Sequence, residues 1–186
     1  MHRFTHPASK VRRLVGVGAA LLFIPSLAIG ALAASGGQAN LAAVRQATAA
    51  YHDVAAAEAA GYGPFYICTD QEGVGAMGQH YVNLGLVLDP AIDPLKPEAL
   101  VYEPLPDGGL RLVAVEYVTF QDAWADAFGS ATPRVLGQDL KPVGAGNRYD
   151  LPPFYQRHVW LWSSNPLGIY NDWNSKVSCR GNGDPA

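Results

Sequence analysis

The sequence predicts an α+β fold: an N-terminal helix, then an antiparallel β-sheet or small β-barrel, with a short second helix. Two observations support this class. Residues 40–60 carry apolar side chains at helical spacing. The chain beyond Gly63 turns to short segments rich in Val, Tyr, Leu and Trp that are separated by Gly and Pro. A helix followed by hairpin-forming strands is typical of an antiparallel sheet with helices on one side.

The first expected element is a helix from Asn40 to about Ala60. Asn40 is a favourable N-cap, and Gly61 is a common helix terminator. His52 lies beside the apolar stripe of this helix, so we interpret it as a surface residue. The stripe recurs every three or four residues and comprises Leu41, Val44, Thr48, Tyr51 and Ala55.

Four later segments are the best strand candidates because they are rich in β-branched and aromatic residues. The third of them is apolar on both alternating faces apart from two charged positions, which predicts the centre of the sheet. A short helix is predicted over Gln121–Phe128, and residues 129–153 are expected to form loops around one weak strand near Arg134–Leu136. The four strand candidates are Gln79–Leu86, Glu98–Glu103, Leu110–Val118 and Arg157–Trp162.

Residues 1–34 have the pattern of a secretory signal peptide: a basic start, an uncharged apolar segment at Leu14–Ile29, and small residues that predict cleavage near Ala33. An uncleaved membrane anchor is the alternative, although the apolar segment is short for a membrane span. We therefore expect a secreted or periplasmic protein with one globular domain at 35–186 and no stable membrane anchor after cleavage. The basic residues of the start are Arg3, Lys10, Arg12 and Arg13.

Charge and cysteine content narrow the function further. The formal net charge of −3, which becomes more negative when the basic leader is removed, gives no support to nucleic-acid binding. Outside the cytoplasm, two cysteines most simply form one disulfide, here between Cys68 and Cys179. A reactive or metal-binding thiol is the alternative.

Ionisable side chains lie inside the apolar strand candidates. A buried carboxylate or imidazole is normally paired, hydrogen-bonded or bound to a metal, because an isolated buried charge is costly. Two histidines and two carboxylates on neighbouring strands predict a divalent-metal site, and this ligand set suits zinc, copper, iron or manganese. The partner is then a metal or a small-molecule ligand, and the oligomeric state is left open. The four residues are His80, Glu103, Glu116 and His158.

The loop between the second and third strand candidates decides whether the two carboxylates can meet. A two-residue loop at Gly108-Gly109 puts Glu103 and Glu116 on the same sheet face as diagonal neighbours. A three-residue loop at residues 106–108 instead pairs Glu103 with Arg111 and turns Glu116 to the other face. The sequence permits both loops.

Two other readings of the same residues stay open. In the first there is no shared site: Glu103 forms a surface pair, His80 is a core histidine, and Glu116 is neutralised by Arg157 or a tyrosine hydroxyl. In the second, Glu116 and a histidine act as acid–base partners in a small enzyme such as a hydrolase or isomerase. No G-x-S-x-G or H-E-x-x-H pattern supports a named enzyme class, so whether the protein is an enzyme is left open.

Aromatic residues gather towards the C-terminus and suggest a third function, a carbohydrate- or protein-binding module. Strand alternation predicts that His158, Trp160 and Trp162 share one face. With Tyr81 beside His80, these rings are candidates for lining a ligand pocket. Packing in the core is the alternative for tryptophans in a small β-domain.

The segment Gly73–Gly78 matches G-x-G-x-x-G, the pattern of dinucleotide-binding turns. That motif requires a strand before it and a helix after it. Here a predicted strand follows, so we interpret the segment as a glycine-rich loop.

Six segments of the sequence carry a resemblance to known proteins: Met77–Asn83, Pro97–Glu103, Val113–Tyr117, His158–Trp162, Asn165–Gly168 and Trp173–Cys179. Together they resemble a group of small secreted bacterial proteins of uncharacterised function. The resemblance covers about residues 45–180. It implies a secreted bacterial domain and no particular activity or ligand. Ser175 stands where the resemblance leads us to expect proline.

Overall fold

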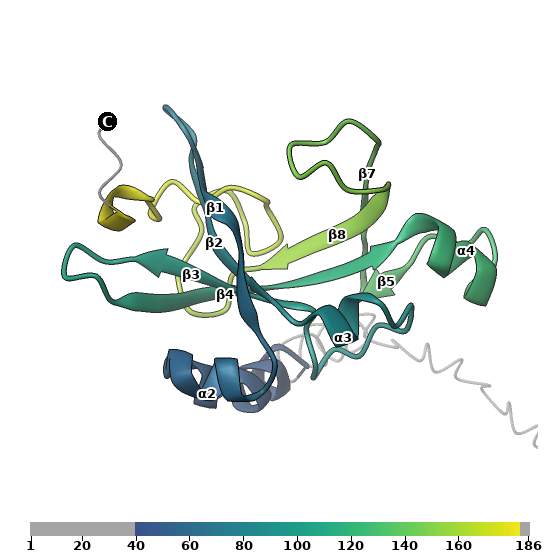
Figure 1. Cartoon of the computed structure of the whole chain (residues 1–186), viewed down its shortest axis with the longest axis horizontal. Coiled ribbons are helices and arrows are strands. Elements are labelled where there is room, and N and C mark those ends of the chain that lie inside the picture. Colours follow the sequence, from purple (N-terminus) through teal and green to yellow (C-terminus); the bar gives the residue numbers. More distant parts are fainter. Residues whose placement is uncertain (1–39, 183–186) are drawn as a thin grey trace, which may run out of the picture.

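An antiparallel sheet of six strands is the framework of the protein. The computed structural model describes residues 40–182, so the predicted signal peptide at 1–34 lies outside the described residues. The sheet is curled into a half-barrel with helices packed against it, which confirms the α+β prediction (Figure 1). Every pair of neighbouring strands is antiparallel. In spatial order the strands are β1 (Gly63–Gln71), β2 (Gly75–Val82), β3 (Ala99–Pro104), β4 (Leu110–Phe120), β8 (Phe154–Val159) and β7 (Lys141–Val143).

The two faces of the sheet are covered by different parts of the chain. The helix face packs against the N-terminal helices, below the sheet in Figure 1. The C-terminal face carries most of the final segment, residues 160–182, which is yellow and lies above the sheet in Figure 1. Residues on alternating strand positions divide between two hydrophobic cores accordingly. The helix-face core includes Val44, Leu100, Tyr102, Val115 and Tyr117; the C-terminal-face core includes Val101, Val113, Ala114, Trp160 and Val177.

The N-terminal helical segment is interrupted at Asp53, so the prediction of one helix from 40 to 60 is wrong in its second half. Asp53 is extended (φ −89°, ψ 112°), and its side chain accepts a hydrogen bond from the first turn of the next helix. This break changes the helical phase, and Ala57 is buried instead of the predicted Ala55. The parts are residues 40–48, η1 (Ala49–His52) and α2 (Val54–Ala59).

The strand predicted at Gln79–Leu86 also ends earlier than expected. The carboxamide oxygen of Asn83 accepts hydrogen bonds from two backbone N–H groups and caps the short helix α3 (Leu84–Val87). A favourable N-cap therefore outweighs the strand propensity of the apolar residues that follow it. The helix predicted at 121–128 is confirmed as α4 (Gln121–Phe128). No helix within residues 40–182 combines the length and apolar character that crossing a bilayer requires.

Residues 129–153 are mostly loops, as predicted, and contain one small hairpin besides β7. Its strands are β5 (Arg134–Val135) and β6 (Gln138–Asp139). The two residues between them, Leu136 and Gly137, both have positive φ angles, which is the requirement of a type I′ turn.

The β3–β4 hairpin combines features of both predicted loops. Glu103 faces Arg111, as the three-residue loop at 106–108 requires. Farther along, a β-bulge at Val113 places an extra residue on β4. Because one extra residue reverses the alternation of side chains, Glu116 returns to the sheet face that carries Glu103.

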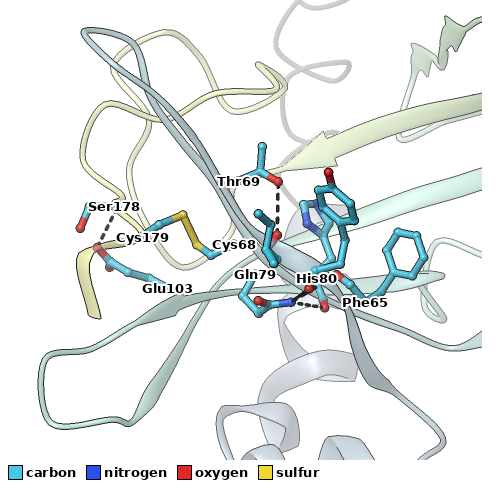
Figure 2. Close-up of a disulfide and its surroundings, with 10 residues drawn as sticks. Phe65, Cys68, Thr69, Gln79, His80, Glu103, Ser178 and Cys179 are labelled. Carbon is cyan, nitrogen blue, oxygen red and sulfur yellow. Dashed lines mark hydrogen bonds between the residues drawn. A yellow bond between two sulfur atoms is a disulfide. The ribbon is translucent and has the colours of Figure 1, made fainter. Parts of the chain in front are cut away.

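The predicted disulfide is present between Cys68 on β1 and Cys179, which precedes η2 (Arg180–Asn182) (Figure 2). It joins residues 111 positions apart. The bond attaches the final segment of the chain to the C-terminal face of the sheet. A disulfide is typical of proteins in an oxidising compartment.

Candidate metal centre

Three strands bring His80, Glu116 and His158 together on the C-terminal face. Glu116 on β4 and His158 on β8 are direct cross-strand partners. His80 on β2 pairs with Val101 on β3, the strand that separates β2 from β4. The curl of the sheet closes the gap across β3, and the three side chains meet.

The donor atoms of these residues surround a common point. The Nε2 atoms of His80 and His158 are 3.1 Å apart, and His80 Nε2 is 3.2 Å from an Oε atom of Glu116. One ligand atom from each residue lies within 4.8 Å of the others. Donors at 2.0–2.1 Å from a tetrahedral ion are separated by about 3.3 Å. The spacing therefore fits a first-row divalent ion, and the cluster could hold a metal.

The cluster is buried, and burial sets its electrostatics. His158 is fully buried, and His80 and Glu116 are each about 5% exposed. Burial acts to raise the pKa of Glu116, but the His158 and His80 imidazoles and the His80 hydrogen bond outweigh it and lower that pKa. Burial lowers the pKa of His158, opposed by the Glu116 charge. An ionised carboxylate beside a neutral imidazole is the protonation state that metal binding requires.

Asp172 lies behind His158 on the final segment. Its Oδ1 atom is 4.0 Å from His158 Nδ1, and neither atom has a hydrogen-bond partner although both are buried. The other carboxylate oxygen of Asp172 is 3.0 Å from Lys141 Nζ. Asp172 is therefore held on one side by a lysine and faces the cluster with the other.

An apolar cavity of about 160 Å³ opens next to the cluster. His80 and Glu116 contribute to its wall, so the ionisable groups lie at the boundary of an otherwise apolar space. Burial and the Glu116 charge raise the pKa of Tyr149, a further lining residue, to about 12, so its hydroxyl stays protonated near neutral pH. The apolar lining comprises Phe65, Val82, Leu84, Val87, Leu88, Val118, Phe120, Leu151 and Phe154.

The structure does not bring the fourth predicted ligand, Glu103, to the cluster. Its carboxylate pairs with Arg111 and accepts a hydrogen bond of 3.1 Å from the backbone N–H of Ser178, beside the disulfide (Figure 2). Glu103 and Glu116 share a sheet face but lie far apart along the hairpin. Glu116 pairs with Ala99 at the start of β3, whereas Glu103 is near the end of β3 and pairs with Arg111. Glu103 therefore fastens the final segment to β3.

The three aromatic residues predicted to bind ligand do not line the cavity. Tyr81 packs in the helix-face core, on the opposite face from His80. Trp160 is buried in the C-terminal-face core, where its N–H donates to the Asn171 carbonyl. Trp162 packs against the helix-face core because β8 ends at Val159, so the predicted alternation does not extend to it.

Sequence reasoning did not identify Asp172, Tyr149 or Leu151 as parts of this region. All three come from irregular segments, where no strand or helix period shows which way a side chain points. The aromatic packing of Tyr149 against Phe65 and Phe154 explains its position in the fold, but it depends on contacts between distant segments.

No family model, curated protein or solved structure matches this chain in the comparisons made. A functional assignment therefore rests on the geometry of the site. Two imidazoles and one carboxylate can hold zinc or a non-haem iron(II) ion and leave coordination positions for another ligand.

Proposed function

We propose that this chain is an exported single-domain protein that binds a divalent metal ion through His80, Glu116 and His158. The observation that carries the proposal is the convergence of three buried donors at ligand spacing beside a cavity. Native proteins rarely bury several ionisable groups together without a function or a strong structural reason.

The ligand set favours zinc or iron(II). Two neutral histidines and one carboxylate form the protein ligands of zinc in several hydrolases, and the same set holds iron(II) in oxygen-activating enzymes. Three protein ligands leave at least one open position, and the cavity beside Glu116 is where an exogenous ligand would reach it. An open position is typical of metal sites that exchange a ligand, whereas structural metal sites are closed by four protein ligands.

The proposed compartment is the periplasm or the exterior of the cell. The Cys68–Cys179 disulfide supports an oxidising environment. The leader pattern at residues 1–34 supports export, with a mature domain that begins near residue 35.

Metal titration tests the proposal directly. The mature chain, freed of metal with a chelator, should bind Zn²⁺ or anaerobic Fe²⁺ with a one-to-one stoichiometry and a dissociation constant below about one micromolar in calorimetry. The variants His80→Ala and His158→Ala should each lose more than about 100-fold in affinity, because they remove direct ligands. His52→Ala, which changes an exposed histidine outside the cluster, is the matched control and should bind like the parent.

The result that would reject the metal site is equally clear. If the chelated protein binds neither ion, or if both cluster variants bind as tightly as His52→Ala, the cluster is not a metal centre. The interpretations that then remain are an acid–base pair formed by Glu116 and a histidine, and a buried cluster with a structural role only.

A further inference from the structure

The cavity beside the cluster is graded from polar to apolar along two paired strands. On β4 and β8 the cross-strand pairs on the C-terminal face are Glu116 with His158, then Val118 with Gln156, then Phe120 with Phe154, and all of these residues except His158 line the cavity. At about 3.3 Å per residue, the last pair lies about 13 Å from the first. A ligand in the cavity would therefore meet ionisable groups at one end and two aromatic rings at the other.

The size of the cavity limits the ligand. A dry cavity of about 150 Å³ in a protein core holds benzene. The cavity of about 160 Å³ here matches one six-membered ring with a short substituent. A long acyl chain or an oligosaccharide does not fit that volume.

The rim of the cavity is apolar as well. Leu84 and Leu88, on and next to α3, are 64% and 71% exposed and both line the cavity. Exposed leucines at the mouth of an apolar pocket indicate a binding surface for apolar groups. Elsewhere in the lining, the Gln79 carboxamide donates to the carbonyls of Phe65 and Tyr66 and fixes the irregular part of β1 that carries Phe65 (Figure 2).

The net charge of the site with a metal ion bound determines which polar group of a ligand it favours. A divalent ion held by the Glu116 carboxylate and two neutral imidazoles has a net charge of +1. In a site with little water, a monoanionic oxygen donor would neutralise that charge at short range. Without the ion, the same anion would meet the Glu116 carboxylate and be repelled.

We infer that the cavity binds a small aromatic or branched monocarboxylate, with its ring or branched body against Phe120 and Phe154 and its carboxylate on the bound metal ion. This inference rests on the proposed metal site and adds the chemical class of its ligand. The ionic contact requires the metal, and the apolar contact requires the cavity.

Calorimetry with three probes separates the two contributions. Benzoate should bind the zinc-loaded chain at least about tenfold more tightly than acetate, which lacks the ring. The reason is that the free energy gained by burying a phenyl group exceeds the free energy that corresponds to a tenfold change in affinity. Benzoate should bind the zinc-loaded chain at least about tenfold more tightly than the metal-free chain. Toluene should bind both forms with similar affinity, because it has no group for the metal.

Variants at the cavity provide the structural test. Val118→Phe places a ring inside the cavity and should abolish benzoate binding; Val74→Phe, the same substitution in the β1–β2 turn, should not. Zinc binding by Val118→Phe reports whether that variant is folded. Leu88→Asp, at an exposed rim position, tests the mouth without filling the core and should weaken benzoate severalfold, whereas Leu167→Asp, exposed and outside the cavity lining, should have no effect.

The outcomes distinguish this inference from the proposal on which it rests. If zinc binds but benzoate is no tighter than acetate, or Leu88→Asp and Leu167→Asp behave alike, the ligand class is wrong and the metal site stands. If zinc does not bind and benzoate binds no form of the chain, both are wrong. If benzoate binds equally with and without zinc, the cavity takes an aromatic acid and the contact with the metal is rejected.

Discussion

His158 has two ring nitrogens, and each has different surroundings. Its Nε2 faces His80 at 3.1 Å, whereas its Nδ1 is 3.4 Å from Glu116 and 4.0 Å from Asp172 without a hydrogen bond to either. If Nε2 binds a metal, the remaining proton of the neutral ring is on Nδ1. An oriented carboxylate that accepts this proton is the common support of a metal-binding histidine, which makes Asp172 a positioning residue.

We therefore expect Asp172→Asn to lower zinc affinity about tenfold, because the amide is a weaker acceptor for the His158 proton. Zinc titration of the folded variant measures the effect. Asp122→Asn, in the first turn of α4, is the control for loss of one negative charge. If the two variants bind zinc with affinities within about twofold of each other, Asp172 does not position His158.

Glu98 is a buried carboxyl group outside the cluster, and it titrates in an unusual range. It is 1% exposed, and its Oε2 accepts a hydrogen bond of 3.1 Å from the Val118 backbone N–H. Burial raises the pKa of Glu98 to about 8, assisted by the charges of Glu116 and Asp93 and opposed by backbone hydrogen bonds. The group therefore keeps its proton in the folded protein at neutral pH.

This raised pKa predicts that stability falls as the solution becomes more alkaline. The unfolded chain releases the Glu98 proton near its ordinary pKa of 4.5, whereas the folded chain keeps it up to about pH 8. The stabilisation is complete below pH 4.5 and is lost progressively as pH rises to about 8, by an amount on the order of 5 kcal/mol. Urea unfolding from pH 5 to 9 should show Glu98→Gln losing less stability than the parent. Parallel curves for the two proteins would contradict the assignment, and the exposed Glu58→Gln is the control.

At the scale of elements, the β1–β2 hairpin depends on glycine for two separable reasons. Gly73, in the turn, has φ +73°, and a Cβ atom there would meet nothing within 4 Å. Gly78, within β2, has φ +101°, and a Cβ atom there would lie 2.8 Å from both the Tyr102 carbonyl oxygen and a Val101 methyl group. The segment that the sequence predicts as a glycine-rich loop is therefore a loop at Gly73 and Val74 only, and its second half, from Gly75 to Gly78, is the start of β2.

Alanine substitutions should separate these two costs. Gly73→Ala should destabilise the protein by about 1 kcal/mol, the cost of the left-handed backbone for a residue with a Cβ atom. Gly78→Ala should cost about 3 kcal/mol or more, because a backbone clash inside the sheet is added to that cost. Urea unfolding of both variants measures the difference, and equal losses would show that the sheet relaxes around the new methyl group.

The elements that the sequence predicts well are those whose pattern is local. The central strand β4 follows from a continuous segment of β-branched and other apolar residues, and the helix α4 follows from helical spacing over eight residues. The errors occur where one polar side chain reorganises the backbone, as with the caps of Asp53 and Asn83. The bulge at Val113 has no sequence signature, yet it decides on which face Glu116 lies.

At the scale of the whole molecule, three of the four predicted ligands meet because the sheet curls across β3. The sequence identifies His80, Glu116 and His158, since ionisable residues in apolar strands stand out from their neighbours. It does not identify the cavity, whose wall combines five strand and helix segments with the loop that carries Tyr149. The curl and this loop are properties of the complete chain, which local periodicity does not encode.

The disulfide acts on the whole molecule because it closes a loop of 111 residues. In the chain-entropy model, a crosslink over about 100 residues stabilises the folded state by about 4–5 kcal/mol. We expect the double variant Cys68→Ala/Cys179→Ala to lose about this much stability in urea. The parent treated with a reductant should fall to a similar value, and the oxidised parent is the reference. Because the three candidate metal ligands lie on β2, β4 and β8 and neither cysteine is one of them, the double variant should still bind zinc under folding conditions with nearly unchanged affinity. A stable double variant that has lost zinc binding would show that the final segment of the chain, with Asp172, holds the cluster together.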